Sequence, residues 1–154
     1  MLDNSPMSWK KGRGKLGRFD PLIGKWRAEA DSEMGVVICT RTFARILDGA
    51  YVQLTADWRY GSKSYKEMAL IGVGPDGNIW FWSFTSDKKQ STGHLADVTD
   101  IHPEAIGFEA EMPAGLARMA YWPGEEEGFN WVVESKTKKG WNRFTEHHYS
   151  EVQE

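Results

Sequence analysis

Apolar and polar residues alternate with a period of two along most of this chain, from about residue 24 almost to its end. Such alternation places successive side chains on opposite faces of a β-strand, whereas a long amphipathic helix would repeat about every 3.6 residues. The pattern predicts about ten strands, near residues 24–33, 36–46, 50–60, 63–73, 78–85, 91–99, 105–112, 116–122, 128–137 and 141–152.

The predicted strands are separated by short segments with the composition of tight turns. Asp76-Gly77 lies between two apolar runs and is the strongest hairpin signal in the chain. Strands joined by short turns are easier to build into an up-and-down barrel than into a sandwich. The sequence therefore predicts an all-β fold, a closed antiparallel up-and-down barrel of about ten strands.

The residues before the first strand differ from the rest of the chain. Residues 1–18 combine three glycines with five cations and little apolar material, so we expect a flexible basic tail. Residues 19–154 are expected to form one barrel domain. A short apolar turn or helix around Pro21 would plug one end of the barrel, through Leu16, Phe19, Leu22 and Ile23.

The same period assigns an inner face to most strands. The inward residues are expected to be Trp26, Ala28 and Ala30 in the first strand, Val52, Leu54, Ala56 and Trp58 in the third, Ile106, Phe108 and Ala110 in the seventh, Phe129, Trp131 and Val133 in the ninth, and Trp141, Arg143, Thr145, His147 and Tyr149 in the last. The fifth strand is ambiguous, because Trp80, Trp82 and Phe84 oppose the equally apolar Ile79 and Phe81. An apolar outer face there would indicate a homodimer contact.

Aromatic residues make up 13% of the 154 residues, which supports a large all-β core and is also typical of ligand cavities. The candidate residues for lining a cavity are Trp58, Trp131, Trp141, Phe108 and Met119. We expect a small apolar molecule as the partner, although simple filling of the core would explain the same residues.

Charge and cysteine content narrow the function classes. Residues 1–18 carry five cations against Asp3 and the rest carries 14 basic and 21 acidic residues, so the two parts have charges of +4 and −7. An acidic body argues against nucleic acid as a partner.

A single cysteine, Cys39, excludes an internal disulfide and fits a reducing compartment. We expect it to be a buried, inert thiol. Because no apolar run approaches the ~20 residues of a membrane span, we expect a cytoplasmic protein.

Two segments carry a family resemblance, Phe19-Asp-Pro-Leu-Ile-Gly-Lys-Trp26 and Phe43-Ala-Arg-Ile-Leu-Asp-Gly-Ala-Tyr-Val52. They resemble the opening of the calycin superfamily, in which a Gly-x-Trp begins the first strand near the closed end of the barrel. More narrowly, the chain is similar to bacterial lipocalin-like domains of unknown function and to nitrobindin-type and fatty-acid-binding-type barrels. The resemblance implies a barrel that holds a small molecule in its interior.

His147 is the candidate haem ligand that this resemblance implies, because nitrobindin-type barrels place their haem-ligating histidine late in the last strand. An inward imidazole among aromatic side chains is able to serve as an axial ligand. The alternative, which we favour, is a histidine at the edge of the core that forms a hydrogen bond to Tyr149, a neighbouring strand or water. Haem is therefore a candidate cofactor only.

Arg143 is the candidate that would bind an acidic group, since an inward guanidinium must be paired. A ligand carboxylate or phosphate would pair with it in two hydrogen bonds, and Glu67 or Asp57 would do so equally well from within the protein. Fatty-acid-binding-type barrels use Arg-x-Tyr for this purpose, and the nearest match here is Arg143-Phe144-Thr145. Arg41 and Arg45 share one strand face and would form a second anion contact, although solvent exposure is the favoured expectation.

No catalytic or metal-binding pattern is recognisable in the sequence. His94 and His102 lack supporting ligands, and neither a Gly-x-Ser-x-Gly elbow nor a P-loop is present. The sequence therefore predicts no particular enzyme activity and leaves the question of catalysis open, and three hypotheses follow. The favoured one is an intracellular protein that binds a small, mostly apolar ligand, with or without an acidic head group. The others are a haem-binding barrel and a non-binding dimeric structural module.

Overall fold

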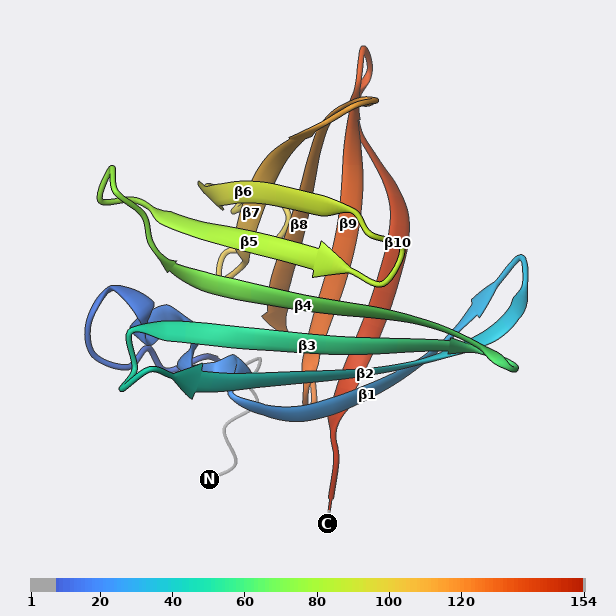
Figure 1. Cartoon of the computed structure of the whole chain (residues 1–154), viewed down its shortest axis with the longest axis horizontal. Coiled ribbons are helices and arrows are strands. Elements are labelled where there is room, and N and C mark those ends of the chain that lie inside the picture. The colour runs from blue at the N-terminus through green and yellow to red at the C-terminus, as the bar shows by residue number, and fades with distance from the viewer. Residues whose placement is uncertain (1–7, 154) are drawn as a thin grey trace.

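The computed structural model of the chain describes residues 8–153. Its ten strands form a closed antiparallel barrel in which each strand pairs with its neighbours in the sequence and the first strand closes on the last (Figure 1). The strands are β1 (Gly24–Ser32), β2 (Gly35–Ile46), β3 (Tyr51–Tyr60), β4 (Lys63–Val73), β5 (Ile79–Thr85), β6 (Gln90–Ala96), β7 (Ile106–Met112), β8 (Gly115–Pro123), β9 (Phe129–Thr137) and β10 (Gly140–Glu151). The predicted all-β, closed up-and-down barrel is confirmed.

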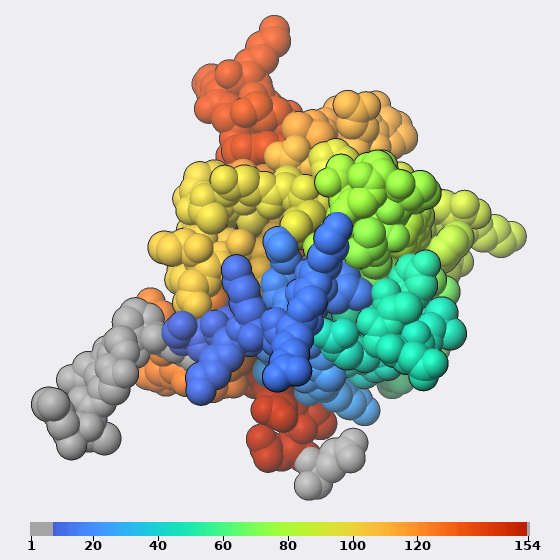
Figure 2. Space-filling model, turned by 90° about the vertical axis from the view of Figure 1, so that its left-hand side faces the viewer, coloured from blue at the N-terminus to red at the C-terminus, as the bar shows by residue number. Residues whose placement is uncertain are grey.

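The barrel has two different ends. At one end, which we call the hairpin end, short turns join β1 to β2, β3 to β4, β5 to β6, β7 to β8 and β9 to β10. At the other, the plugged end, a 3₁₀ helix η1 (Lys15–Leu22) lies across the mouth of the barrel. Figure 2 shows this helix in blue between the β2–β3 turn in turquoise, the β4–β5 turn in green and the β6–β7 loop in yellow.

The η1 helix closes the plugged end with apolar side chains. Leu16, Phe19 and Leu22 are buried in the main core, and the Phe19 ring stacks on Phe108 with centroids 5.9 Å apart. The Trp26 indole nitrogen donates to the carbonyl oxygen of Leu22 at 2.8 Å, which joins the helix to β1. The predicted plug is thus present, with Ile23 at its exposed edge.

The predicted basic tail is described only in part. Residues 1–7 lie outside the described residues. The Trp9 backbone N–H donates to Glu104 Oε1 at 3.0 Å, and the Trp9 ring packs against the main core. Because η1 continues across residue 18, the domain boundary that we placed there stays a prediction.

The inner face follows the predicted period in most strands. The predicted inward residues of β1, β3, β7 and β9 lie in the main core, pack against it or, for Ala110, line a cavity inside the barrel. In β5, Ile79 and Phe81 are buried, and Phe84 is 44% exposed on the opposite face. A homodimer through this outer face stays a prediction. No helix in residues 8–153 is long and apolar enough to cross a membrane.

A bulge in β10 overturns part of the predicted inner face. Arg143 pairs with Glu134 of β9, but the next pair is Thr145 with Val133, so β10 has one extra residue at Phe144. An extra residue reverses the faces on one side of the bulge. His147 therefore faces inward as predicted, whereas the predicted inward orientation of Trp141 and Arg143 is wrong.

Candidate binding site inside the barrel

A cavity of about 270 Å³ lies inside the half of the barrel nearer the hairpin end. Its lining is mostly apolar and comes mainly from the inner faces of β4 to β10, with Arg118 of β8 also at its edge. The lining includes Phe81, Phe108, Met112, Met119, Trp131, Val133 and Phe144. The structure thus brings together three of the predicted lining residues, Trp131, Phe108 and Met119. Trp58 adjoins them, because its ring meets the Trp131 ring edge-on at 5.7 Å.

Glu67 is the one carboxylate among the described residues that line this cavity. It lies on the inner face of β4, and one of its oxygens, Oε2, accepts a hydrogen bond from Ser83 Oγ at 2.5 Å. The cavity is therefore apolar with a small number of polar groups, which is typical of sites for small molecules.

Arg41 lies in the interior of the barrel, so the expected solvent exposure is wrong. Its side chain is 1% exposed, because Arg41 occupies the inner position of β2 between the buried residues Cys39 and Phe43. Its Nη1 donates to the Tyr121 hydroxyl at 2.6 Å, and its Cζ lies 4.2 Å from the centre of the Trp131 ring. No carboxylate in the described part of the chain lies within 4.0 Å of its nitrogens.

Two buried hydrogen-bond donors in this cluster have no partner. They are Nε of Arg41 and Nε1 of Trp131; the Tyr121 hydroxyl lies near Trp131 and the Tyr149 hydroxyl near Arg41, but within the described residues neither of these two nitrogens has an acceptor in hydrogen-bond geometry. An unpaired buried donor costs about 1–3 kcal/mol, and more when the group is charged. Sequence reasoning missed this feature, although its signal was the arginine placed between Cys39 and Phe43 on one strand face.

Burial keeps most titratable groups in this cluster neutral and leaves Arg41 charged. Burial raises the pKa values of the Tyr121 and Tyr149 hydroxyls above their usual range, so both remain protonated at neutral pH. Burial works against the Arg41 cation, but Tyr121, Tyr149 and Glu67 hold its pKa above the ordinary value. Cys39 is buried as expected, and burial raises the pKa of its thiol, which favours the unreactive form.

His147 faces inward between the rings of Trp58 and Trp131, at 5.2 and 5.4 Å. Burial, together with the positive charge of Arg41, lowers the pKa of His147 to about 4. Its imidazole is therefore neutral at pH 7, and its Nδ1 lies 3.4 Å from the Tyr149 hydroxyl. A hydrogen bond from His147 to Tyr149 is one of the contacts that we predicted for a structural histidine at the edge of the core.

A side pocket of about 770 Å³ lies where β1 and β10 separate. The two strands pair only at Trp26 with Glu151 and at Arg27 with Ser150. Trp58 and His147, which face the interior of the barrel, form the inner side of this pocket. The barrel wall is therefore open on this side, next to the interior aromatic cluster.

Arg143 and Trp141 lie on the outer face in an ion-pair network. Arg143 Nε donates to Glu134 Oε2 at 2.9 Å, and Arg118 Nε donates to the other oxygen of the same carboxylate at 2.8 Å. Asp100 of the β6–β7 loop binds Arg118, and the Trp141 ring covers the Arg118 guanidinium at 4.1 Å. Arg143 is thus paired within the protein, but by Glu134 rather than by the expected Glu67 or Asp57.

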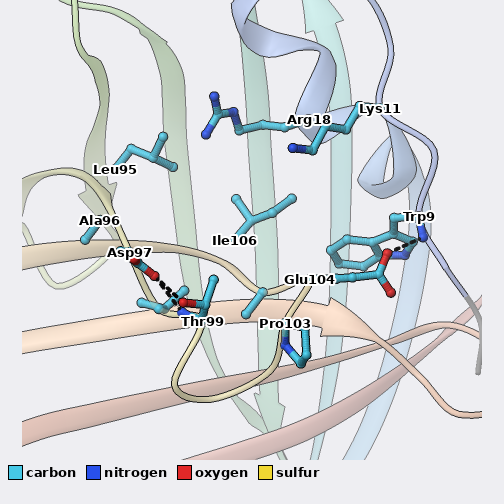
Figure 3. A pocket seen from close by; sticks show the side chains of 12 residues that line it. Trp9, Lys11, Arg18, Leu95, Ala96, Asp97, Thr99, Pro103, Glu104 and Ile106 are labelled. Atoms are coloured by element: carbon cyan, nitrogen blue, oxygen red, sulfur yellow. Dashed lines mark hydrogen bonds between the residues drawn. The ribbon is translucent and has the colours of Figure 1, made fainter.

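A further pocket, of about 350 Å³, lies at the plugged end between the N-terminal segment and the β6–β7 loop. Figure 3 shows Lys11 and Arg18 extending over Ile106, with Trp9 beside Glu104. The Glu104 carboxylate already accepts hydrogen bonds from Ser8 Oγ and the Trp9 N–H. This pocket is more polar than the cavity inside the barrel.

The remaining histidines and acidic residues do not form a metal site. Within residues 8–153 no group of three or more His, Cys, Asp or Glu side chains is arranged to hold a metal ion. His94 lies edge-on to Trp80, and His102 Nδ1 accepts the backbone N–H of Glu104. Comparison of the chain with protein-family models finds no match, and comparison with curated proteins finds none either.

Proposed function

We propose that this protein binds a small, mostly apolar molecule inside its barrel. The observation that carries the proposal is the cavity of about 270 Å³, lined by aromatic and methionine side chains next to the buried Arg41 cluster. Methionine side chains adapt to ligands of different shape, and aromatic ones contribute large apolar contacts.

The size of the cavity limits the affinity that apolar burial alone supplies. Each buried CH₂ group contributes about 0.8 kcal/mol, so a chain of about eight carbons gains roughly 6 kcal/mol. Association itself costs about 4–15 kcal/mol in lost freedom of motion. These two contributions are similar in size, and polar contacts therefore decide whether binding is tight.

The proposal includes a family and a location. A closed antiparallel barrel of ten strands is compatible with a calycin-like fold. The resemblance of residues 19–26 and 43–52 supports a lipocalin-like member of that superfamily. The single buried thiol of Cys39 supports a protein of the reducing cytoplasm.

A cavity-filling variant tests the proposed site. Ala117 lines the cavity, so Ala117→Phe should occupy much of the space and lower the affinity for a neutral apolar dye such as Nile red by about tenfold or more. Ala44 is exposed on the outer face of β2, and Ala44→Phe serves as the matched control. Dye binding that is unaffected by Ala117→Phe, or absent from the unaltered protein, would contradict the proposal.

A haem-binding barrel is the second candidate, and the position of His147 favours it. A neutral imidazole borders the side pocket, and a proton on Nδ1 shared with Tyr149 would leave the Nε2 lone pair free for iron. Bound haem would supply ligand binding or redox chemistry at its iron. A Soret band after haem addition that disappears in His147→Ala would support this function; no band, or the same band in the variant, would exclude His147 as the ligand.

A further inference from the structure

Buried donors outnumber buried acceptors around Arg41. The guanidinium carries five N–H groups, and one of its nitrogens, Nη1, donates to the Tyr121 hydroxyl. Arg41 Nε and Trp131 Nε1 have no acceptor within hydrogen-bond geometry, and Tyr121 carries a further O–H, whereas the Tyr149 hydroxyl contacts His147 Nδ1. These donors lack acceptors, and because Arg41 forms no ion pair with Glu67, a negatively charged acceptor suits the cluster best.

We infer that the ligand of this barrel carries a carboxylate, which binds at Arg41, Trp131 and Tyr121. The inference rests on the proposed function and specifies the chemistry of the ligand. A carboxylate has two oxygens that accept several hydrogen bonds, and it matches the planar geometry of a guanidinium.

Neither a water molecule nor another side chain of the described residues supplies what a ligand carboxylate would bring to this cluster. Water would accept hydrogen bonds from the two unpaired donors, but it would leave the buried positive charge without an ion-pair partner. Glu67 faces the interior and attracts Arg41 electrostatically, but it makes no ion pair with it and is bound by Ser83. Arg143 lies on the outer face, where Glu134 already pairs with it.

Trp131 links the carboxylate site to the cavity. Its ring lines the cavity, its face contacts the Arg41 guanidinium, and its indole N–H is one of the two unpaired donors. Arg41 does not itself line the cavity, so a head group reaches it only when the Trp131 side chain moves. The bound ligand would then have its head group near Tyr121 and its apolar tail toward Val133 and the hairpin end.

Three probes separate the contributions of head group and tail. Isothermal titration calorimetry at pH 7.5 compares octanoate, 1-octanol and acetate on the full chain. We expect octanoate to bind about tenfold or more tighter than 1-octanol, and acetate to bind weakly, because hydrogen bonds to charged groups are stronger than those between neutral groups and acetate lacks the apolar tail.

The variant Arg41→Leu should abolish the preference for octanoate and retain the binding of 1-octanol. Arg27→Leu is the matched control, because it removes the same charge from an exposed position on β1 and should retain the preference. Equal affinity for octanoate and 1-octanol in the unaltered protein would overturn the carboxylate site and leave the proposed function standing. Absence of binding by both would overturn the proposed function, and tight acetate binding would assign the donors to a free small anion instead.

A spectroscopic readout avoids any dependence on the folding of an Arg41 variant. The Trp131 indole N–H resonance, assigned by its loss in Trp131→Phe, should shift on octanoate addition. The Trp26 indole N–H is held by the Leu22 carbonyl and should not move. An unchanged Trp131 resonance at saturating octanoate would overturn the proposed role of its N–H.

Discussion

Buried arginine side chains supply charged groups to this barrel, and their burial affects its stability. Arg41 is a fully buried cation whose contacts are aromatic rings and one tyrosine hydroxyl. Arg118 is buried to a similar extent on the outer face, but its guanidinium is paired with both Glu134 and Asp100. The two arginines therefore differ in pairing rather than in burial.

Replacing these two arginines with methionine should change stability in opposite directions. Arg41→Met removes a buried charge that forms no ion pair, and we expect the free energy of unfolding to rise by about 1–4 kcal/mol, as when apolar residues replace buried ionic groups. Arg118→Met leaves Asp100 and Glu134 without this partner, and we expect a loss of about 3 kcal/mol. Urea unfolding measures both, and an Arg41 variant destabilised as strongly as the Arg118 variant would show that Arg41 has an internal partner.

His147 should make the protein less stable in acid. Its pKa is about 4 in the folded state against 6.5 in the unfolded chain, so the unfolded state binds the additional proton between these values. Stability is therefore complete above about pH 6.5 and decreases as the pH falls toward 4, by up to about 3 kcal/mol.

Urea unfolding of His147→Gln between pH 4 and pH 7 checks this expectation. The variant should lose much of the slope, whereas His94→Gln, at an exposed position, should retain it. An identical pH dependence in the unaltered protein and in His147→Gln would show that His147 does not titrate in this range.

At the scale of elements, period-two alternation predicted the strands because one face of each is apolar. Turn-forming residues predicted most of the breaks between strands, because turn preference, like alternation, depends on neighbouring residues in the sequence. The faces on the hairpin side of β10 were not predictable, because the bulge at Phe144 depends on pairing with β9 and leaves no mark in the alternation. The position of Arg41 was missed because most arginines lie at the surface, and only the closed barrel makes its strand face interior.

The η1 helix is predicted to hold the plugged end of the barrel. Phe19 is fully buried against Phe108, so Phe19→Ala should lower the free energy of unfolding by about 3–5 kcal/mol. Ile23→Ala, at 38% exposure, should cost less than about 1 kcal/mol. Similar losses in the two variants would mean that the helix contributes little to the closure of the barrel.

The whole molecule is a closed barrel plugged at one end, with an apolar cavity in its other half and a side opening between β1 and β10. The fold alone is compatible with many functions, since barrels of this kind hold ligands or fill themselves with side chains. What distinguishes this barrel is the combination of a cavity with two unpaired buried donors beside it. Both features depend on contacts between distant strands, so the sequence predicted the barrel but did not specify its ligand.

Native mass spectrometry of the gently purified full chain, before and after incubation with octanoate, tests the central claim most directly. We expect one bound small molecule per chain, either carried through purification or acquired on incubation, and its loss in Ala117→Phe. A bare polypeptide mass under both conditions, or an adduct that Ala117→Phe retains, would contradict a binding site inside the barrel.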